Sequence, residues 1–251
     1  MTTSSLQGKV AVVTGGALGL GRQITAQLLE QGARVAILGR TAETLQRAAD
    51  ELGENLLPVV ADVADPQQVR QAFSTIVAAF GGVDILVNNA AIYRAFGLDE
   101  ASDEELQTTF VVNVLGPTYC IREAIPLMRQ RGGGDIVNVS SESARAPFPM
   151  LAAYAASKGA LETLSAGLRN ELRADGIRVT VFRSGHMNGD NTSVLSWPEG
   201  RLQRFLEAIE LSGHGRFVGA GMAPQTVARA LVSAITLPRE ANVDFFEVRP
   251  A

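Results

Sequence analysis

An apolar, β-branched run that leads directly into a glycine-rich turn is the feature that most constrains this fold. Val10 to Val13 forms the run, and Thr14-Gly-Gly-Ala-Leu-Gly-Leu-Gly21 follows it at once. Apolar residues then recur at helical spacing up to Gly32, which supplies a helix stop. A helix that opens on glycines offers free backbone N–H groups and the positive end of its dipole to a pyrophosphate. The pattern predicts a dinucleotide-binding unit, with an ordinary glycine turn as the alternative.

Strand-like and helical segments alternate along the rest of the chain. The further apolar runs are Arg34 to Leu38, Leu56 to Val60, Ile85 to Val87, Ile136 to Val139 and Val179 to Phe182. Helix starts are marked by Asp65-Pro66, a capping carboxylate before proline, and by a capping box from Ser102 to Glu105. This order predicts an α/β fold with a doubly wound parallel sheet, the Rossmann fold, in a single domain spanning residues 1–251.

Composition limits the partners and the compartment. The net charge is −4, with acidic and basic residues interspersed, so neither nucleic acid nor a membrane is expected as a partner. Residues 1–9 are polar and no run approaches the ~20 apolar residues of a membrane span, so a cytoplasmic location is expected. Cys120 is the single cysteine and is predicted to lie in the core. The two histidines, His186 and His214, have no Cys or Glu cluster beside them, so no metal site is expected.

Tyr154 and Lys158 stand four residues apart, close to one helical turn, so their side chains leave the same face. A phenol in water titrates near ~10, and an ammonium a few ångströms away favours the phenolate and lowers that pKa. Such a tyrosine can act as general acid or base. The spacing alone is also compatible with a surface pair.

Several motifs in order along the chain carry a resemblance to a known family. The glycine turn matches Thr-Gly-x-x-x-Gly-x-Gly at Thr14, Gly15, Gly19 and Gly21. The later motif positions are Asp62, Asn88-Asn-Ala-Ala91, Asn113, Ser141, Tyr154 and Lys158. Over nearly its whole length the chain resembles the short-chain dehydrogenase/reductase family, in its NADP-preferring branch.

The resemblance implies a role for each catalytic candidate. Lys158 would bind the nicotinamide ribose and lower the pKa of Tyr154, Tyr154 would move a proton on the substrate oxygen, and Ser141 would steady the developing charge. Ser141 is preferred to Ser140 because it lies thirteen residues before Tyr154, as is usual in the family. Asn113 would hold a water in a proton relay to the lysine, or else it is a polar residue satisfied inside a helix bend.

The end of the second strand predicts which cofactor is preferred. Gly39 stands where an NAD-specific fold usually has an acidic residue, and Arg40 and Thr41 follow it. A guanidinium can pair with a 2′-phosphate, so NADP is expected and NAD is the weaker alternative, unless Arg40 is only a solvated residue at a helix entrance. The predicted cofactor-binding residues are Thr14, Gly15, Gly19, Leu20, Gly21, Arg40, Thr41, Asp62, Val63, Asn89, Ala90, Lys158 and Gly185. The cofactor half would span residues 1–130 and the catalytic half residues 131–251.

One segment departs from the family pattern. The family commonly has Pro-Gly followed four residues later by a Thr that binds the nicotinamide carboxamide. This chain has Ser184-Gly-His-Met-Asn-Gly189, so Ser184 replaces the proline and Gly189 the threonine. Asn188, Asn191 or Thr192 are the candidate substitutes.

Substrate recognition is predicted in two segments. A lid over residues 189–221 carries Trp197, Phe205 and Phe217, and the stretch from Arg145 to Met150 forms another wall. The predicted substrate-binding residues are Tyr93, Arg145, Phe148, His186 and Trp197, and a mid-sized, partly apolar carbonyl compound fits them. Core packing is the alternative for each aromatic residue.

The sequence therefore predicts an NADP-dependent carbonyl reductase or alcohol dehydrogenase that acts on a small molecule, with the direction of reaction left open. A non-catalytic, nucleotide-sensing binding protein on the same fold is the alternative from another class. It would not need the Ser, Tyr and Lys set. A homotetramer or homodimer is implied by the resemblance, with apolar helix faces around Leu106 to Met128 and Ala153 to Leu172 as candidate contacts.

Overall fold

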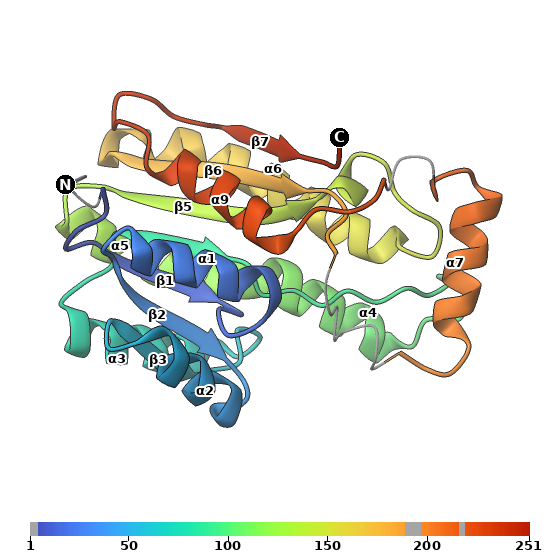
Figure 1. The fold of residues 1–251 in the computed structure, drawn as a ribbon, viewed down its shortest axis with the longest axis horizontal. Coiled ribbons are helices and arrows are strands. Elements are labelled where there is room, and N and C mark those ends of the chain that lie inside the picture. Colours follow the sequence, from blue (N-terminus) through green and yellow to red (C-terminus); the bar gives the residue numbers. More distant parts are fainter. Residues whose placement is uncertain (1–4, 189–196, 216–218) are drawn as a thin grey trace.

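The computed structural model describes residues 5–188, 197–215 and 219–251, and its centre is a parallel sheet (Figure 1). The strands are β1 (Val10–Thr14), β2 (Arg34–Gly39), β3 (Leu56–Val60), β4 (Ile85–Asn88), β5 (Gly134–Ser141), β6 (Ile177–Ser184) and β7 (Phe245–Val248). They form a seven-stranded sheet in the order β3-β2-β1-β4-β5-β6-β7. The order reverses between β1 and β4, the point where such sheets bind ligands at the carboxyl ends of their strands.

Helices cover both faces of the sheet, which makes three layers and two cores. On one face lie α1 (Gly19–Glu30), α2 (Ala42–Leu52) and α9 (Pro224–Ile235), and on the other lie α3 (Pro66–Phe80), α5 (Gly116–Gln130) and α6 (Ala152–Leu172). Figure 1 shows α1 and α9 in front of the sheet and α6 behind it. The doubly wound fold expected from the sequence is confirmed. Among the described residues, no helix is long and apolar enough to cross a membrane.

Local signals placed most elements correctly. All six predicted strands are present, and β5 and β6 are longer than expected. The Asp65 carboxylate accepts the backbone N–H groups of Gln67 at 2.8 Å and Gln68 at 3.3 Å, and the capping box of Ser102 and Glu105 is formed. The edge strand β7 was not predicted. It is short and its first residue, Phe245, is exposed, so it lacks the buried apolar run of the other strands.

The helix expected around Leu106 to Met128 is wrong as a single element. It divides into α4 (Asp103–Phe110), a π-helical turn over Val111–Leu115, and α5. The Gly116 N–H donates to the carbonyl of Val111, five residues back, and Pro117 has no N–H to continue the α-helical pattern. The π-helical turn contains Asn113, so this irregularity lies beside the candidate site.

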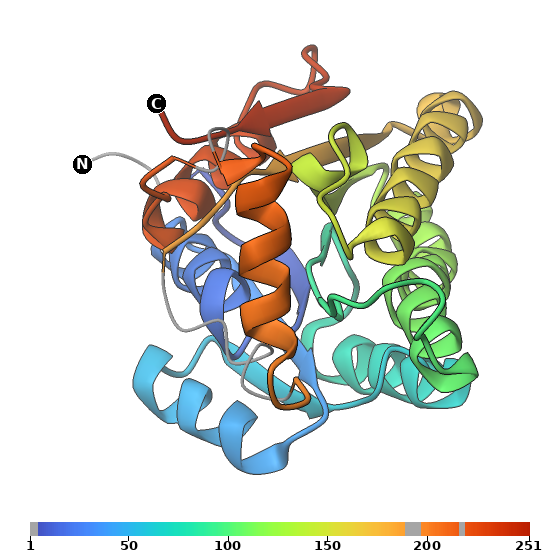
Figure 2. The same cartoon turned by 90° about the vertical axis from the view of Figure 1, so that its right-hand side faces the viewer.

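Figure 2 looks onto the carboxyl ends of the strands, where α7 (Arg201–Leu211) lies across the front of the molecule. Two ion pairs tie α7 to the segment around α4, between Arg201 and Glu105 at 2.5 Å and between Arg204 and Glu100 at 2.7 Å. Helix α7 therefore covers the end of the sheet at which the predicted site residues meet.

Candidate active site

Hydrogen bonds fasten the glycine-rich turn to the turn that follows β4. The Thr14 hydroxyl accepts the backbone N–H groups of Asn89 and Ala90, each at 3.0 Å. The Asn89 side-chain amide donates to the Thr14 carbonyl at 3.0 Å. Neighbouring strands thus hold both turns at the switch point of the sheet, which explains why threonine and asparagine are needed there.

The glycines leave room for a backbone that approaches closely. A Cβ on Gly21 would lie 2.2 Å from the Gly15 carbonyl oxygen, and a Cβ on Gly16 would lie 2.4 Å from Cγ2 of Ile37. Gly16 was not among the predicted residues, because its requirement comes from a neighbouring strand. Leu20 packs into the core, so only its backbone can contact a ligand.

The start of α1 fits a pyrophosphate. Its N-cap Leu18 provides no side-chain hydrogen bond, and the first turn contains no acidic residue. Gly19 has a φ of +51° and nothing within 4 Å of the position of a Cβ. The first N–H groups therefore face an open, uncharged space in which an anion is favoured.

At the other end of the cofactor region, Arg40 and Thr41 are exposed between β2 and α2. Among the residues with described positions, the Arg40 side chain has neither a hydrogen bond nor an ion pair. Asp62 is half-buried and its carboxylate accepts the N–H of Ala64 at 2.9 Å. Val63 is buried against Gly116, so its role here is packing.

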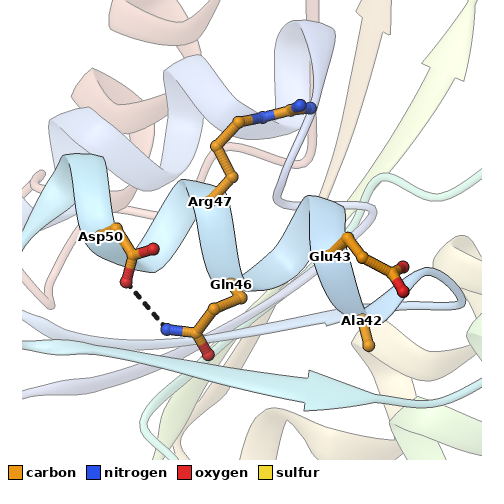
Figure 3. Close-up of a pocket in the computed structure, with 5 residues that line it drawn as sticks. All are labelled: Ala42, Glu43, Gln46, Arg47 and Asp50. Carbon is orange, nitrogen blue, oxygen red and sulfur yellow. Dashed lines mark hydrogen bonds between the residues drawn. The ribbon is translucent and has the colours of Figure 1, made fainter.

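A hollow of about 490 Å³ opens on the outer surface of α2 (Figure 3). Its lining residues are Ala42, Glu43, Gln46, Arg47 and Asp50. The Gln46 amide donates to Asp50 at 2.9 Å, and the side chains stand on one exposed helix without a buried wall opposite them. Helix α2 lies on the opposite face of the sheet from α6, which carries the paired tyrosine and lysine, so we place the chemistry at the strand ends instead.

Tyr154 and Lys158 lie on α6, and Ser141 ends β5 opposite them. The Ser141 hydroxyl is hydrogen-bonded to the phenol of Tyr154. The Lys158 Nζ lies 5.9 Å from the centre of the Tyr154 ring and donates to the carbonyl of Val139 at 2.8 Å. The structure thus brings together the three residues that the sequence singled out.

The expected lowering of the tyrosine pKa is wrong for this structure. Burial raises the pKa of Tyr154 to about 12, against the smaller opposite effect of the Ser141 hydrogen bond. Burial also lowers the pKa of Lys158 to about 8, which the charge of Glu162 partly offsets. The spacing of the pair is as predicted, but the ammonium donates to a backbone carbonyl and both groups are desolvated.

Asn113 is buried in the π-helical turn and connects three segments. Its Oδ1 accepts the N–H of Ile92 at 2.8 Å, and its Nδ2 donates to the Ile92 carbonyl at 3.0 Å and to Oγ of Ser157 at 3.1 Å. Ser157 in turn donates to the Tyr154 carbonyl at 2.6 Å. Ser157 was not predicted, although it lies between the tyrosine and the lysine. Ser140 is buried and donates to Glu162 at 2.5 Å.

Aromatic side chains form a wall beside the tyrosine. The ring of Tyr93 lies 5.0 Å from that of Tyr154, edge to face, and 5.6 Å from that of Trp197. The indole N–H of Trp197 donates to the Tyr93 carbonyl at 3.1 Å, and burial raises the pKa of Tyr93. Phe148 and Phe205 belong to the same apolar cluster. These residues exclude water from the phenol, which is the cause of its raised pKa.

The side chains of the other predicted substrate-binding residues, Arg145 and His186, are more exposed to solvent than the aromatic wall. Arg145 is half-exposed and pairs with Glu247 at 3.3 Å, and the His186 side chain is exposed. Gly185 is buried where β6 ends, and its N–H donates to the Val248 carbonyl at 2.8 Å. The predictions for Gly189, Asn191, Thr192 and Phe217 fall outside the described residues.

Glu142, directly after Ser141, is a half-buried carboxyl that was not predicted, since only its tertiary neighbours distinguish it.

Further predictions concern the single cysteine and metal binding. Cys120 lies in the core as predicted, and burial raises its pKa to about 12. Over the described ranges, the structure has no group of three His, Cys, Asp or Glu side chains that could hold a metal ion.

Comparison with known proteins gives a consistent set of matches. The model of the family described as short chain dehydrogenase matches residues 9–198. An uncharacterized oxidoreductase of Staphylococcus aureus (strain USA300) is 30% identical over 246 residues, which cover 98% of each chain. The structure of L-sorbose reductase from Gluconobacter frateurii, complexed with NADPH and L-sorbose, is 28% identical with a TM-score of 0.86, covering 99% of this chain and 97% of that one. Serine dehydrogenase complexed with NADP⁺ is 28% identical with a TM-score of 0.83, covering 96% and 94%.

Proposed function

Because the chain belongs to the short-chain dehydrogenase family and is therefore a nicotinamide-dependent oxidoreductase, we propose that it interconverts a ketone or aldehyde and the corresponding alcohol with NADP(H). The observation that carries this proposal is the meeting of Ser141, Tyr154 and Lys158 beneath an aromatic wall. A partly apolar carbonyl compound fits such a wall. The small-molecule complex of the sorbose reductase supports a substrate of this general size.

Each residue of the site has a distinct task in this proposal. Tyr154 donates its phenolic proton to the carbonyl oxygen during reduction, because with a pKa of about 12 it is protonated at neutral pH. Ser141 donates a hydrogen bond to the same oxygen and stabilises the charge that develops there. Lys158 would bind the nicotinamide ribose, and its ammonium lies 5.9 Å from the centre of the phenol ring. Asn113 donates to the Ser157 hydroxyl, which donates to the Tyr154 carbonyl, so it holds the helix turn that carries the tyrosine. Bound NADP(H) would supply or accept the hydride.

Preference for NADP(H) rests on the cofactor region. Gly39 places no carboxylate at the end of β2, and beside it stand the Thr41 hydroxyl and the Arg40 guanidinium, which has no partner among the described residues. A fixed cationic fork favours a 2′-phosphate, whereas a carboxylate would repel it. The NADP(H) complexes of the two structural neighbours support this assignment.

Three further features belong to the proposal. Residues 1–130 would hold most of the cofactor, residues 131–251 would supply catalysis, and residues 189–221 would close over the substrate. The protein would act in the cytoplasm as a homotetramer or homodimer. Phe110 and Leu115, exposed to 40% and 41%, lie on the outside of the α4 region and offer an apolar contact to a second copy.

The Tyr154→Phe variant tests the catalytic proposal. It removes only the phenolic oxygen, so we expect turnover of aldehydes and ketones to be abolished while the Kd for NADPH, measured by its fluorescence, stays within a few-fold. The wild-type protein in the same assay tests the alternative, a non-catalytic nucleotide-sensing protein. A wild-type protein that binds NADPH but turns over no carbonyl compound or alcohol would be a nucleotide-sensing protein. Full activity of the variant on a substrate with rate-limiting chemistry would sink the role of Tyr154.

A further inference from the structure

Glu142 is a half-buried carboxylate beside Ser141 to which the reaction itself gives no task. It follows Ser141 directly and opens a short 3₁₀ turn over Glu142–Ala144. Its carboxylate accepts the backbone N–H of His186, and a Cβ on Gly185 would lie 3.2 Å from its Oε2. The glycine therefore leaves the space that this carboxylate occupies, between the ends of β5 and β6.

The negative charge of Glu142 acts on the reacting groups. It raises the pKa of Tyr154 and that of Tyr93, in each case as a smaller cause than burial. Glu142 directly follows Ser141, whose hydroxyl is hydrogen-bonded to the Tyr154 phenol, so it lies at the strand end where the substrate oxygen would bind. A substrate held by Ser141 and Tyr154 would therefore have Glu142 beside it.

Two arginines stand near Glu142, but both pair with a different acid. Arg145 lies 3.3 Å from Oε1 of Glu247, and Arg249 lies 3.6 Å from the same oxygen. Burial raises the pKa of Glu142, and Glu247 adds to this, whereas Arg249 and Arg145 lower it. Within the described part of the chain, Glu142 has no ion pair of its own. It has one hydrogen bond and the capacity to accept several more.

A half-buried carboxylate without an ion pair is costly unless something donates to it. We propose that Glu142 determines substrate specificity by accepting a hydrogen bond from a hydroxyl or a protonated amine on the carbon next to the reacting carbon. The inference deepens the proposed carbonyl–alcohol chemistry and rests on it. The preferred substrates are then α-hydroxy carbonyl compounds or 1,2-amino alcohols, and both present the same donor to the same carboxylate.

Matched pairs of compounds isolate the donor. 2-Hydroxyacetophenone and propiophenone differ only by a hydroxyl in place of a methyl group and are compared as ketones with NADPH. 2-Amino-1-phenylethanol and 1-phenyl-1-propanol differ only by an amine in place of that methyl group and are compared as alcohols with NADP⁺. In both pairs the phenyl ring suits the aromatic wall. The ketone pair tests a hydroxyl as the donor to Glu142, and the alcohol pair tests an amine.

Glu142→Gln is the main variant, because its amide oxygen still accepts the N–H of His186 while the charge is lost. A hydrogen bond to a charged group is worth ~1.5–3 kcal/mol, so kcat/KM for a donor-bearing compound should fall roughly ten- to a hundredfold. The lost charge also acts on Tyr154 with either compound, so the decisive quantity is the ratio of kcat/KM between the donor-bearing compound and its apolar twin, which should fall by that factor, while the Kd for NADPH stays nearly unchanged. Glu54→Gln removes the same charge from an exposed loop and should change neither compound of a pair.

Each outcome decides the matter. The proposal is established if the wild type prefers a donor-bearing compound and Glu142→Gln abolishes that preference. The compound pair that responds more identifies the donor as a hydroxyl or an amine. Equal losses for both members of a pair would show that Glu142 only shapes the pocket, and equal wild-type efficiency on both would show that no donor is recognised. In these two cases the proposed function stands. Absence of turnover on all four compounds, with NADPH still bound, would overturn the specificity inference together with the proposed function.

Discussion

Replacing Lys158 by methionine should make this protein more stable at neutral pH. Lys158 is 3% exposed, and its ammonium donates one hydrogen bond, to Val139 at 2.8 Å, although it carries three donors. The nearest opposite charge, Glu162, is already engaged by Arg183 at 2.7 Å. The charged amine is therefore buried with little compensation, and its pKa is lowered from 10.5 to about 8.

The magnitude follows from the pKa. At ~1.4 kcal/mol for each pKa unit, the difference between 10.5 and about 8 means that burying the charge costs about 3 kcal/mol. Lys158→Met removes this cost, keeps a flexible apolar side chain, and loses one hydrogen bond worth ~1 kcal/mol. The net gain at neutral pH is about 2 kcal/mol, or a rise in Tm of roughly 4–8 °C for a chain of this length.

The direction of the pH dependence is fixed by the lowered pKa. Between pH 8 and pH 10.5 the unfolded wild type binds more protons at Lys158 than the folded one, so wild-type stability rises with pH across this range. The free-energy cost of burying the Lys158 ammonium applies in full below about pH 8 and disappears above about pH 10.5. The advantage of the variant should therefore be largest near neutral pH and should disappear, or reverse, near pH 10.5.

Two measurements test this reasoning on the cofactor-free protein. Urea denaturation at pH 7 and pH 10 gives the difference in the free energy of unfolding between Lys158→Met and wild type. The chain has only two lysines, so NMR titration of ¹³C-lysine protein gives two signals, which the variant assigns. Lys9, 52% exposed, is the internal control. A Lys158 signal that titrates near 10, or a variant less stable than wild type by the same amount at both pH values, would show that the buried ammonium does not destabilise the fold.

Three further predictions concern the cofactor, the pH profile and the assembly. Arg40→Ala should raise the Kd for NADPH roughly ten- to a hundredfold and leave that for NADH nearly unchanged, with Arg47→Ala on the adjacent helix α2 as the control; equal weakening of both cofactors would contradict the assignment. The kcat/KM for carbonyl reduction should fall as the pH rises above about 8, where Lys158 loses its proton while Tyr154 keeps its own up to about 12; a constant value up to pH 10 would rule this out. Light scattering should give a dimer or tetramer, and a particle of 26.5 kDa at micromolar concentration would exclude both.

Local patterns were sufficient for most of the fold. The run Val10 to Val13 and the glycines after it predict a strand, a turn and a helix because each requirement lies within a few neighbouring residues. The strand β7 could not be found in this way, since an exposed edge strand needs only one partner, β6, to form. The π-helical turn at Asn113 was also missed, although Pro117 marks the place where an α-helix loses a donor.

The sequence was enough to predict that Ser141, Tyr154 and Lys158 lie together, but not the directions in which the pKa values of the tyrosine and the lysine shift. Spacing along one helix was enough to pair Tyr154 with Lys158, and their strand-end position was enough to add Ser141. The environment of these groups is set by Tyr93, about sixty positions earlier in the chain, and by Trp197, about forty positions later. A pKa that depends on such distant packing cannot be read from the motif itself. Glu142 was missed for the same reason.

The burial that displaces both pKa values has a chemical consequence. It moves the pKa of Tyr154 up to about 12 and that of Lys158 down to about 8, so near neutral pH the site holds a neutral phenol beside a largely protonated amine. This is the protonation state that a carbonyl reduction needs, because the phenol has a proton to give. Oxidation of an alcohol needs the phenolate, and raising the phenol pKa from 10 to about 12 makes that form harder to reach by about 3 kcal/mol. A protonated amine at Glu142 would offset a negative charge that also opposes the phenolate, and a hydroxyl donor would weaken its effect to a smaller extent, so occupation of the pocket should itself make Tyr154 a stronger acid.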